Sequence, residues 1–202
     1  MTGLRADLSL IAALVPANAR VLDLGCGTGD LLHWLQANRE VNGYGLEIDH
    51  GKIATCIRKG VNVIERNIDE DLSDFESDSF DRVIMAETLQ AMRYPARVIH
   101  EMLRIAPEGI VTFPNFGHWR CRAFLAARGR MPVSSNLPHS WYDTPNIHLC
   151  TFADFEAFCR AENIRITRRL VVDGDYRQRS LTNLWPNLFG TFAIYGIARA
   201  GI

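Results

Sequence analysis

VLDLGCGTG, residues 21–29, is an apolar run that passes directly into three closely spaced glycines. The apolar run predicts a short buried strand with Asp23 near its end. Gly25, Gly27 and Gly29 let the strand turn tightly into a helix and let main-chain N–H groups approach a bound molecule. The segment therefore predicts a strand, a loop and a helix that together form a ligand site.

The spacing of the glycines identifies the kind of ligand. A dinucleotide site needs G-x-G-x-x-G and hence glycine at position 30, where Asp30 stands. The pattern D-x-G-x-G-x-G resembles instead the S-adenosylmethionine loop of class I methyltransferases. A second acidic residue is then expected about 20 residues further on, to accept hydrogen bonds from the ribose hydroxyls. Glu47, in GYGLEID, stands at that place, and it disfavours the alternative of a turn that binds nothing.

Length and composition set the class of protein. A chain of 202 residues with 48% hydrophobic content can bury one substantial core, so we expect a single domain over residues 1–202. The net charge of −1 gives no global field toward nucleic acid or a membrane surface. Five cysteines without a C-x-x-C pair argue against a disulfide framework and a zinc site, and we expect a cytoplasmic protein.

The N-terminal segment is apolar only from Leu8 to Val15. It has no small-residue cleavage pattern and is too short to span a membrane. It predicts a first amphipathic helix that ends at Pro16.

Apolar strands alternate with helical periodicity through the first half of the chain, which predicts a doubly wound parallel sheet. Asp49 is the expected N-cap of one helix, Pro95 the expected first-turn residue of another, and Thr151 with Asp154 a capping box. The expected α/β fold is Rossmann-like, with a mostly parallel seven-stranded sheet, helices on both faces and an antiparallel edge. The predicted strands are residues 20–24, 43–48, 61–65, 80–85, 110–113, 164–172 and 192–198.

The regular alternation stops at about residues 114–150, and we expect an insertion over the ligand face there. Arginines and aromatics share residues 119–130 at helical spacing, which predicts a helix with a basic face. Docking to an acidic partner or a substrate carboxylate is favoured over nucleic-acid binding. Three histidines, His118, His139 and His148, match no zinc motif, so no metal is expected.

Ligands of a doubly wound sheet lie beyond the carboxyl ends of its strands. By resemblance to class I methyltransferases, Asn67 and the Ile68 backbone would contact adenine where those enzymes usually carry Gly-Asp, although a solvated turn is the alternative. Glu87 either faces the cofactor or is an exposed carboxylate. No residue stands out as catalytic. The predicted cofactor-binding residues are Asp23, Gly25, Cys26, Gly27, Gly29, Glu47, Ile48, Asn67, Ile68 and Ala86.

From residue 19 to about residue 176 the chain resembles the MetW family of bacterial methionine-biosynthesis proteins. The segments that carry this resemblance are VLDLGCGTGDLL, GYGLEID, SFDRVIMAETLQAMRYP, FPNFGHWRCR and GRMPVSSNLPHSWYDTPNIHLCT. WYDTPNIHLCT, residues 141–151, is the most specific of them. Asn67 in place of the usual aspartate, and the residues after Asp175, depart from the family pattern.

The resemblance implies binding of S-adenosylmethionine or S-adenosylhomocysteine and partnership with a homoserine O-acyltransferase of the α/β-hydrolase type. The acyl-transfer chemistry would belong to the partner, because this chain contains no nucleophile elbow G-x-S-x-G. Two alternatives stay open: a working methyltransferase on a small molecule, and a methyltransferase-like scaffold with a vestigial pocket.

Overall fold

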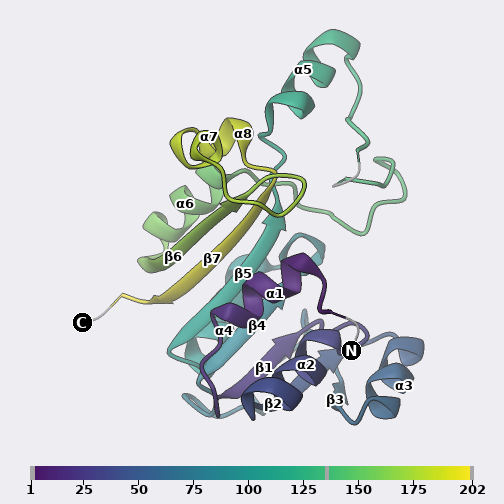
Figure 1. Ribbon diagram of the computed structural model, residues 1–202, viewed down its shortest axis with the longest axis vertical. Helices are drawn as coiled ribbons and strands as arrows, with labels where there is room; N and C mark the ends of the chain where they lie inside the picture. Colours follow the sequence, from purple (N-terminus) through teal and green to yellow (C-terminus); the bar gives the residue numbers. More distant parts are fainter. Residues whose placement is uncertain (1–2, 135–136, 201–202) are drawn as a thin grey trace.

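A seven-stranded sheet in the order β3-β2-β1-β4-β5-β7-β6 forms the centre of the molecule (Figure 1). The computed structural model describes residues 3–134 and 137–200, so residues 135 and 136 of the predicted insertion lie outside it. β7 runs antiparallel to both of its neighbours, and the other pairs are parallel. The predicted fold is therefore confirmed. The strands are β1 (Arg20–Leu24), β2 (Asn42–Glu47), β3 (Asn62–Glu65), β4 (Arg82–Ala86), β5 (Glu108–Pro114), β6 (Ile164–Val172) and β7 (Phe192–Arg199).

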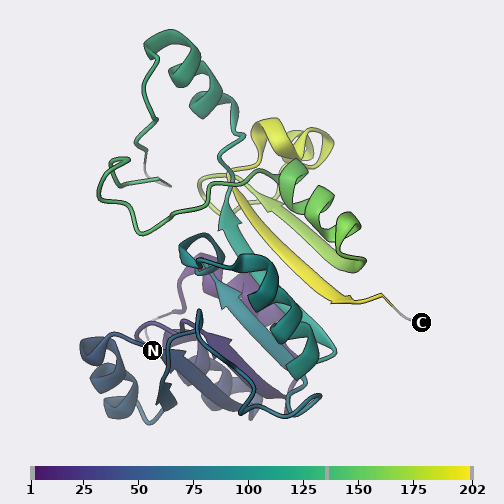
Figure 2. The same ribbon diagram turned by 180° about the vertical axis from the view of Figure 1, so that it is seen from behind.

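Helices cover both faces of the sheet because successive strand residues point to opposite sides. In β4, Ile84 packs with the cluster that includes α1 and α2, while Val83 and Met85 pack with the cluster that includes α4 and α6. Figures 1 and 2 show these two layers from opposite sides. The helices are α1 (Ala6–Ala13), α2 (Asp30–Arg39), α3 (His50–Arg58), the 3₁₀ turn η1 (Leu89–Ala91), α4 (Pro95–Ile105), α5 (Trp119–Arg128), α6 (Phe152–Ala161), α7 (Ser180–Leu184) and α8 (Pro186–Phe189).

The helix starts follow the local signals of the sequence. The Asp49 side chain accepts from the Lys52 N–H at 3.0 Å and caps α3. Pro95 is the first residue of α4. Thr151 and Asp154 form the reciprocal hydrogen bonds of a capping box at α6. All three predictions are confirmed. Asp49 and Thr151 satisfy main-chain N–H groups that a helix start leaves without a partner, and Pro95 has no such N–H group to satisfy.

The segment after β5 leaves the body of the protein. α5 projects beyond the strand ends (Figures 1 and 2), and Cys121 is its one buried residue. The helix ends at Arg128, earlier than predicted, because Gly129 adopts a left-handed conformation with φ 60°. Within the described ranges, no helix is both long and apolar enough to cross a bilayer.

Candidate functional site

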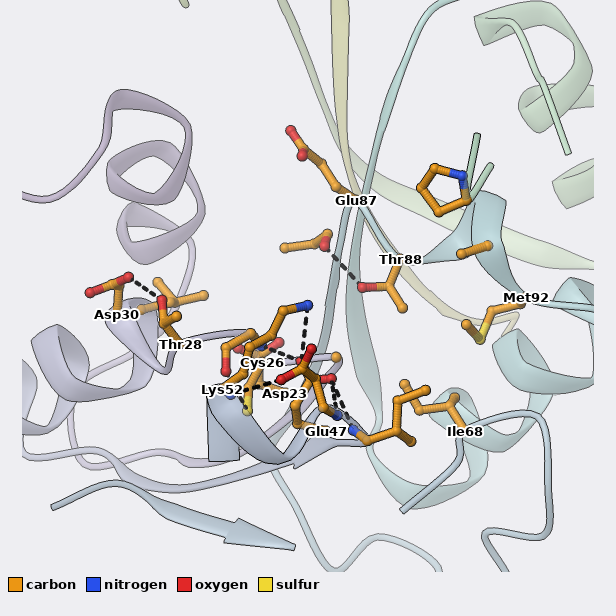
Figure 3. Close-up of a pocket in the computed structure, with 18 of the residues that line it drawn as sticks. Asp23, Cys26, Thr28, Asp30, Glu47, Lys52, Ile68, Glu87, Thr88 and Met92 are labelled. Atoms are coloured by element: carbon orange, nitrogen blue, oxygen red, sulfur yellow. Dashed lines mark hydrogen bonds and ion pairs between the residues drawn. The ribbon is translucent and has the colours of Figure 1, made fainter. Parts of the chain in front are cut away.

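A cavity of about 610 Å³ opens at the carboxyl ends of β1, β2 and β4 (Figure 3). This is the edge where the chain order of the parallel strands reverses, and where open α/β sheets bind ligands. All the predicted site residues except Gly29 line it. Gly29 has φ 73°, and a Cβ there would meet Cys56 Sγ at 2.9 Å, so this glycine serves the turn into α2.

The glycine loop is anchored to the neighbouring strand. The Gly25 and Cys26 N–H groups donate to the Leu46 carbonyl at 2.9 and 3.0 Å, which continues the ladder between β1 and β2. Gly25 has φ 82°, and a Cβ there would lie 2.6 Å from Thr88 Oγ1. Gly27 has φ 58°, and a Cβ there would meet nothing within 4 Å. Packing thus excludes a side chain at Gly25, whereas the space beside Gly27 belongs to the open cavity.

The Glu47 carboxylate is held rigidly at the end of β2. Its oxygens accept from the N–H groups of Gly27 at 3.0 Å, Ile48 at 2.9 Å and Asp49 at 3.1 Å. Lys52 Nζ lies 3.9 Å from Oε2. A carboxylate offers about four acceptor positions, so these three bonds orient the group and leave capacity for a hydroxyl donor.

Asp23 is a buried carboxylate at the end of β1. It is 2% exposed, and its Oδ1 has no hydrogen-bond partner within residues 3–134 and 137–200. Burial, followed by the charge of Glu47, raises the pKa of Asp23 to about 7. Since a buried polar atom normally has a partner, Asp23 marks a place where the cavity wall suits a cationic donor.

The remaining predicted residues form the polar and apolar sides of the cavity. Ile48 exposes 60% of its surface beside Glu47. Ile68 is buried, and Ala86 is half-buried at the end of β4. Asn67 is exposed, and its Oδ1 accepts from the Asp69 N–H at 3.1 Å. Asn67 therefore lines the cavity and also closes a local turn, so both interpretations of this residue stay open.

Glu87 lies in the cavity wall and is also exposed, so both predicted positions hold in part. It has the left-handed φ of 54°, and its N–H donates to Thr112 Oγ1 at 3.0 Å. Partial desolvation, followed by the charge of Asp7, raises the pKa of Glu87. In Figure 3 its carboxylate points away from those of Asp23 and Glu47.

Sequence reasoning missed two contributions to the cavity. Arg5 and Asp7 reach it from the N-terminal helix, where Arg5 Nε donates to Asp7 Oδ1 at 3.1 Å. A charged pair at the start of an apolar helix was the available signal. Pro145 and Asn146 reach the cavity from the segment after α5, and local sequence gives no signal for that path.

The two histidines on helices α2 and α4 make local contacts. His33 Nδ1 lies 3.0 Å from the Lys59 carbonyl, and His100 Nε2 lies 2.9 Å from Glu162 Oε2, as structural roles require. Of the residues that the structure describes, no group of three or more His, Cys, Asp or Glu could hold a metal ion.

The fold has close counterparts among solved structures at low sequence identity. An S-adenosylmethionine-dependent methyltransferase from Mesorhizobium loti superposes with a TM-score of 0.69 and 16% identity, covering 96% of this chain and 98% of that one. At this identity the similarity establishes the class I methyltransferase fold.

Two relatives are closer in sequence. The bifunctional methionine biosynthesis protein MetXA/MetW of Rhodopirellula baltica is 31% identical in an alignment of 205 positions, which covers 97% of this chain and 33% of the relative. A ubiquinone biosynthesis O-methyltransferase of Hahella chejuensis is 32% identical in an alignment of 147 positions, which covers 68% of this chain and 61% of the relative. The chain thus spans about a third of the first relative and less than two thirds of the second.

A family model supplies the narrower assignment. The model described as "Methionine biosynthesis protein MetW" matches residues 5–197, nearly the whole chain. The match extends beyond the glycine loop through α5 and the specific segment that follows it. The chain therefore belongs to the MetW family of methionine-biosynthesis proteins.

Proposed function

We propose that this chain binds S-adenosylmethionine, or its demethylated product, in the cavity at the strand ends and acts with a homoserine O-acyltransferase. The proposed binding of this ligand rests mainly on Asp23. A buried carboxylate with an oxygen that has no partner among the described residues, beside an open glycine loop, suits the ammonium group of the methionine moiety.

The other residues fit the remaining parts of this ligand. Gly27 has no side chain and the space beside it is open, so its main chain could lie against the ligand. Glu47, already oriented by three N–H groups, would accept from a ribose hydroxyl. Ile48 offers an exposed apolar surface for the adenine ring. The bound sulfonium would supply an electrophilic methyl group.

Adenine would lie between the ends of β2 and β3. Asn67 and Ile68 line the cavity after β3, and Ala86 lines it at the end of β4. Because the Asn67 amide oxygen already accepts from Asp69, its contact with the adenine amino group would use the second lone pair.

Calorimetry with S-adenosylmethionine and S-adenosylhomocysteine tests the ligand. Glu47→Gln should weaken binding at least about ten-fold, because it places an amide group among main-chain donors and removes the charge. Glu65→Gln is the matched control: Glu65 is the register partner of Glu47 on β3, but its side chain is 61% exposed. Absence of binding, or equal weakening by both variants, would contradict the proposal and favour a vestigial pocket.

The acyltransferase partnership rests on family membership. The relative from Rhodopirellula baltica carries the names MetXA and MetW on one chain, which supports joint action of two such units. Acyl transfer would be the partner's reaction, and the role proposed for this chain is that of an activating or regulatory subunit.

We assign docking to the segment of residues 114–150, which we propose covers the ligand face. Trp141 and Tyr142 expose 75% and 74% of their surfaces there, and Trp119 and Phe124 of α5 are also exposed. Aromatic side chains of this kind often supply most of the binding energy when a partner covers them.

Co-elution with the same organism's homoserine O-acyltransferase tests the surface. Trp141→Ala should weaken the complex, whereas Trp185→Ala, at an exposed tryptophan outside the segment, should leave it intact. Equal effects of the two changes would count against this docking surface.

A second candidate function is methyl transfer to a small molecule. The Hahella relative, an O-methyltransferase by its name, is the observation that favours it. Positioning and desolvation supply much of the rate of methyl transfer, so the lack of an evident general base does not argue against it. Transfer of labelled methyl to a metabolite extract would support this function, and tight binding without turnover would favour the subunit.

A further inference from the structure

A second cavity, of about 340 Å³, adjoins the first. The two share Arg5, Glu87, Pro145 and Asn146 among their lining residues. The second cavity continues past the end of β5 to the start of β7. Its volume falls within the lower range of small-molecule sites.

Gln90 supplies the first evidence that this cavity has a ligand. Its side chain is 2% exposed, and Nε2 makes one long hydrogen bond of 3.4 Å to the Pro114 carbonyl. Gln90 Oε1 has no partner in the part of the chain that the structure describes. Because buried amide oxygens are normally satisfied, a donor brought by a ligand would complete this site.

The charges of the cavity indicate what such a ligand carries. The Arg5 guanidinium pairs with Asp7 through two of its five N–H donors, so three remain for a carboxylate. The charges of Arg5 and Asp7 cancel in their ion pair, so the Glu87 carboxylate makes this part of the cavity wall negative. Desolvation, followed by the charges of Asp7 and Glu87, raises the pKa of the Tyr176 hydroxyl in the cavity wall. This environment favours a positively charged donor close to Glu87.

We propose that the second cavity binds a small α-amino acid. Its ammonium group would donate to Glu87 and to Gln90 Oε1, and its carboxylate would accept from the free donors of Arg5. The inference goes beyond the proposed function and does not depend on the acyltransferase partnership. It places an amino acid beside the cavity that we assign to the methyl donor.

Gln90 also connects this cavity to the proposed docking segment. The Gln90 carbonyl accepts from the N–H groups of Ile147 and His148, both at 2.9 Å. Asn146, the preceding residue, lines both cavities. A ligand that contacts Gln90 therefore lies next to the anchoring point of this segment.

Calorimetry with the common L-amino acids and L-homoserine tests the proposal. The titrations are run with and without saturating S-adenosylhomocysteine, since a methionine-like compound could otherwise enter the first cavity. We expect at least one amino acid to bind in both conditions, and its analogue without the amino group to bind at least about ten-fold more weakly.

Three variants distinguish the site from a merely structural role. Glu87→Gln and Gln90→Met should each weaken binding of that amino acid about ten-fold or more. Glu40→Gln is the matched control, because Glu40 is also exposed and has a similar φ of 53° but lines neither cavity. Binding of no amino acid, or equal binding to Glu87→Gln and wild type, would overturn the proposal even if S-adenosylmethionine binds normally.

Discussion

Replacement of Asp23 by Asn should make the ligand-free protein more stable at neutral pH. The pKa of Asp23 rises from 3.8 to about 7 in the folded state, through burial and then through the charge of Glu47. The folded protein therefore binds more protons than the unfolded chain between these two pH values. The contribution of Asp23 to the free energy of unfolding falls as the pH rises through that window and is constant above it.

The size of the effect follows from the shift. Each pKa unit corresponds to about 1.4 kcal/mol, so ionised Asp23 costs the folded state about 4 kcal/mol above pH 7. Asn has the same shape and no charge, so the free energy of unfolding of the variant should exceed that of wild type by about 2–4 kcal/mol at pH 8. At pH 5 this difference should be about 2 kcal/mol smaller. The gain in stability should come with weaker binding of S-adenosylmethionine.

Urea unfolding, followed by circular dichroism at several pH values between 5 and 8, measures this difference. Asp81→Asn is the control. The hydrogen bond from Arg20 lowers the pKa of Asp81, so the ionised Asp81 stabilises the folded state, and its removal should have the opposite effect on stability. That variant should be less stable than wild type at neutral pH. Equal stability of Asp23→Asn and wild type at pH 8, or a difference independent of pH, would refute the reasoning.

Three further predictions concern the loop, a cap and the ligand. Gly25→Ala should lower stability by about 1–3 kcal/mol in urea unfolding, because its Cβ would strike Thr88; Gly60→Ala, also at positive φ but in open space, should cost less. Thr151→Ala should cost about 1 kcal/mol in the same assay because the capping box of α6 is lost. S-adenosylmethionine should bind more tightly at pH 7.5 than at pH 5.5 in calorimetry, because ionised Asp23 is its proposed partner; equal affinity at both values would argue against that contact.

Much of the fold was predictable because its signals are local. The glycine loop, the Asp49 cap and the Thr151 capping box each depend on residues a few positions apart. The parallel order of the sheet then brings Asp23 and Glu47, far apart in sequence, to one edge without further information. Their joint presence in the cavity wall follows from the strand pattern alone.

The remainder depends on tertiary packing that no local pattern encodes. Arg5 reaches the cavity because α1 packs against the sheet, and its sequence specifies only an apolar face. Asn146 reaches it because the Gln90 carbonyl anchors the neighbouring residues. Gln90 itself lies in a short 3₁₀ turn after β4, and only the three-dimensional structure shows that its amide oxygen is buried with no partner in residues 3–134 and 137–200.

In the subunit role that we propose, this chain acts on another enzyme's reaction. The most direct measurement is the rate of homoserine acylation by the same organism's homoserine O-acyltransferase, with and without this protein, together with co-elution of the two. We expect a strong increase in rate and a stable complex. An unchanged rate and separate elution would contradict the subunit role and leave methyl transfer as the function to pursue.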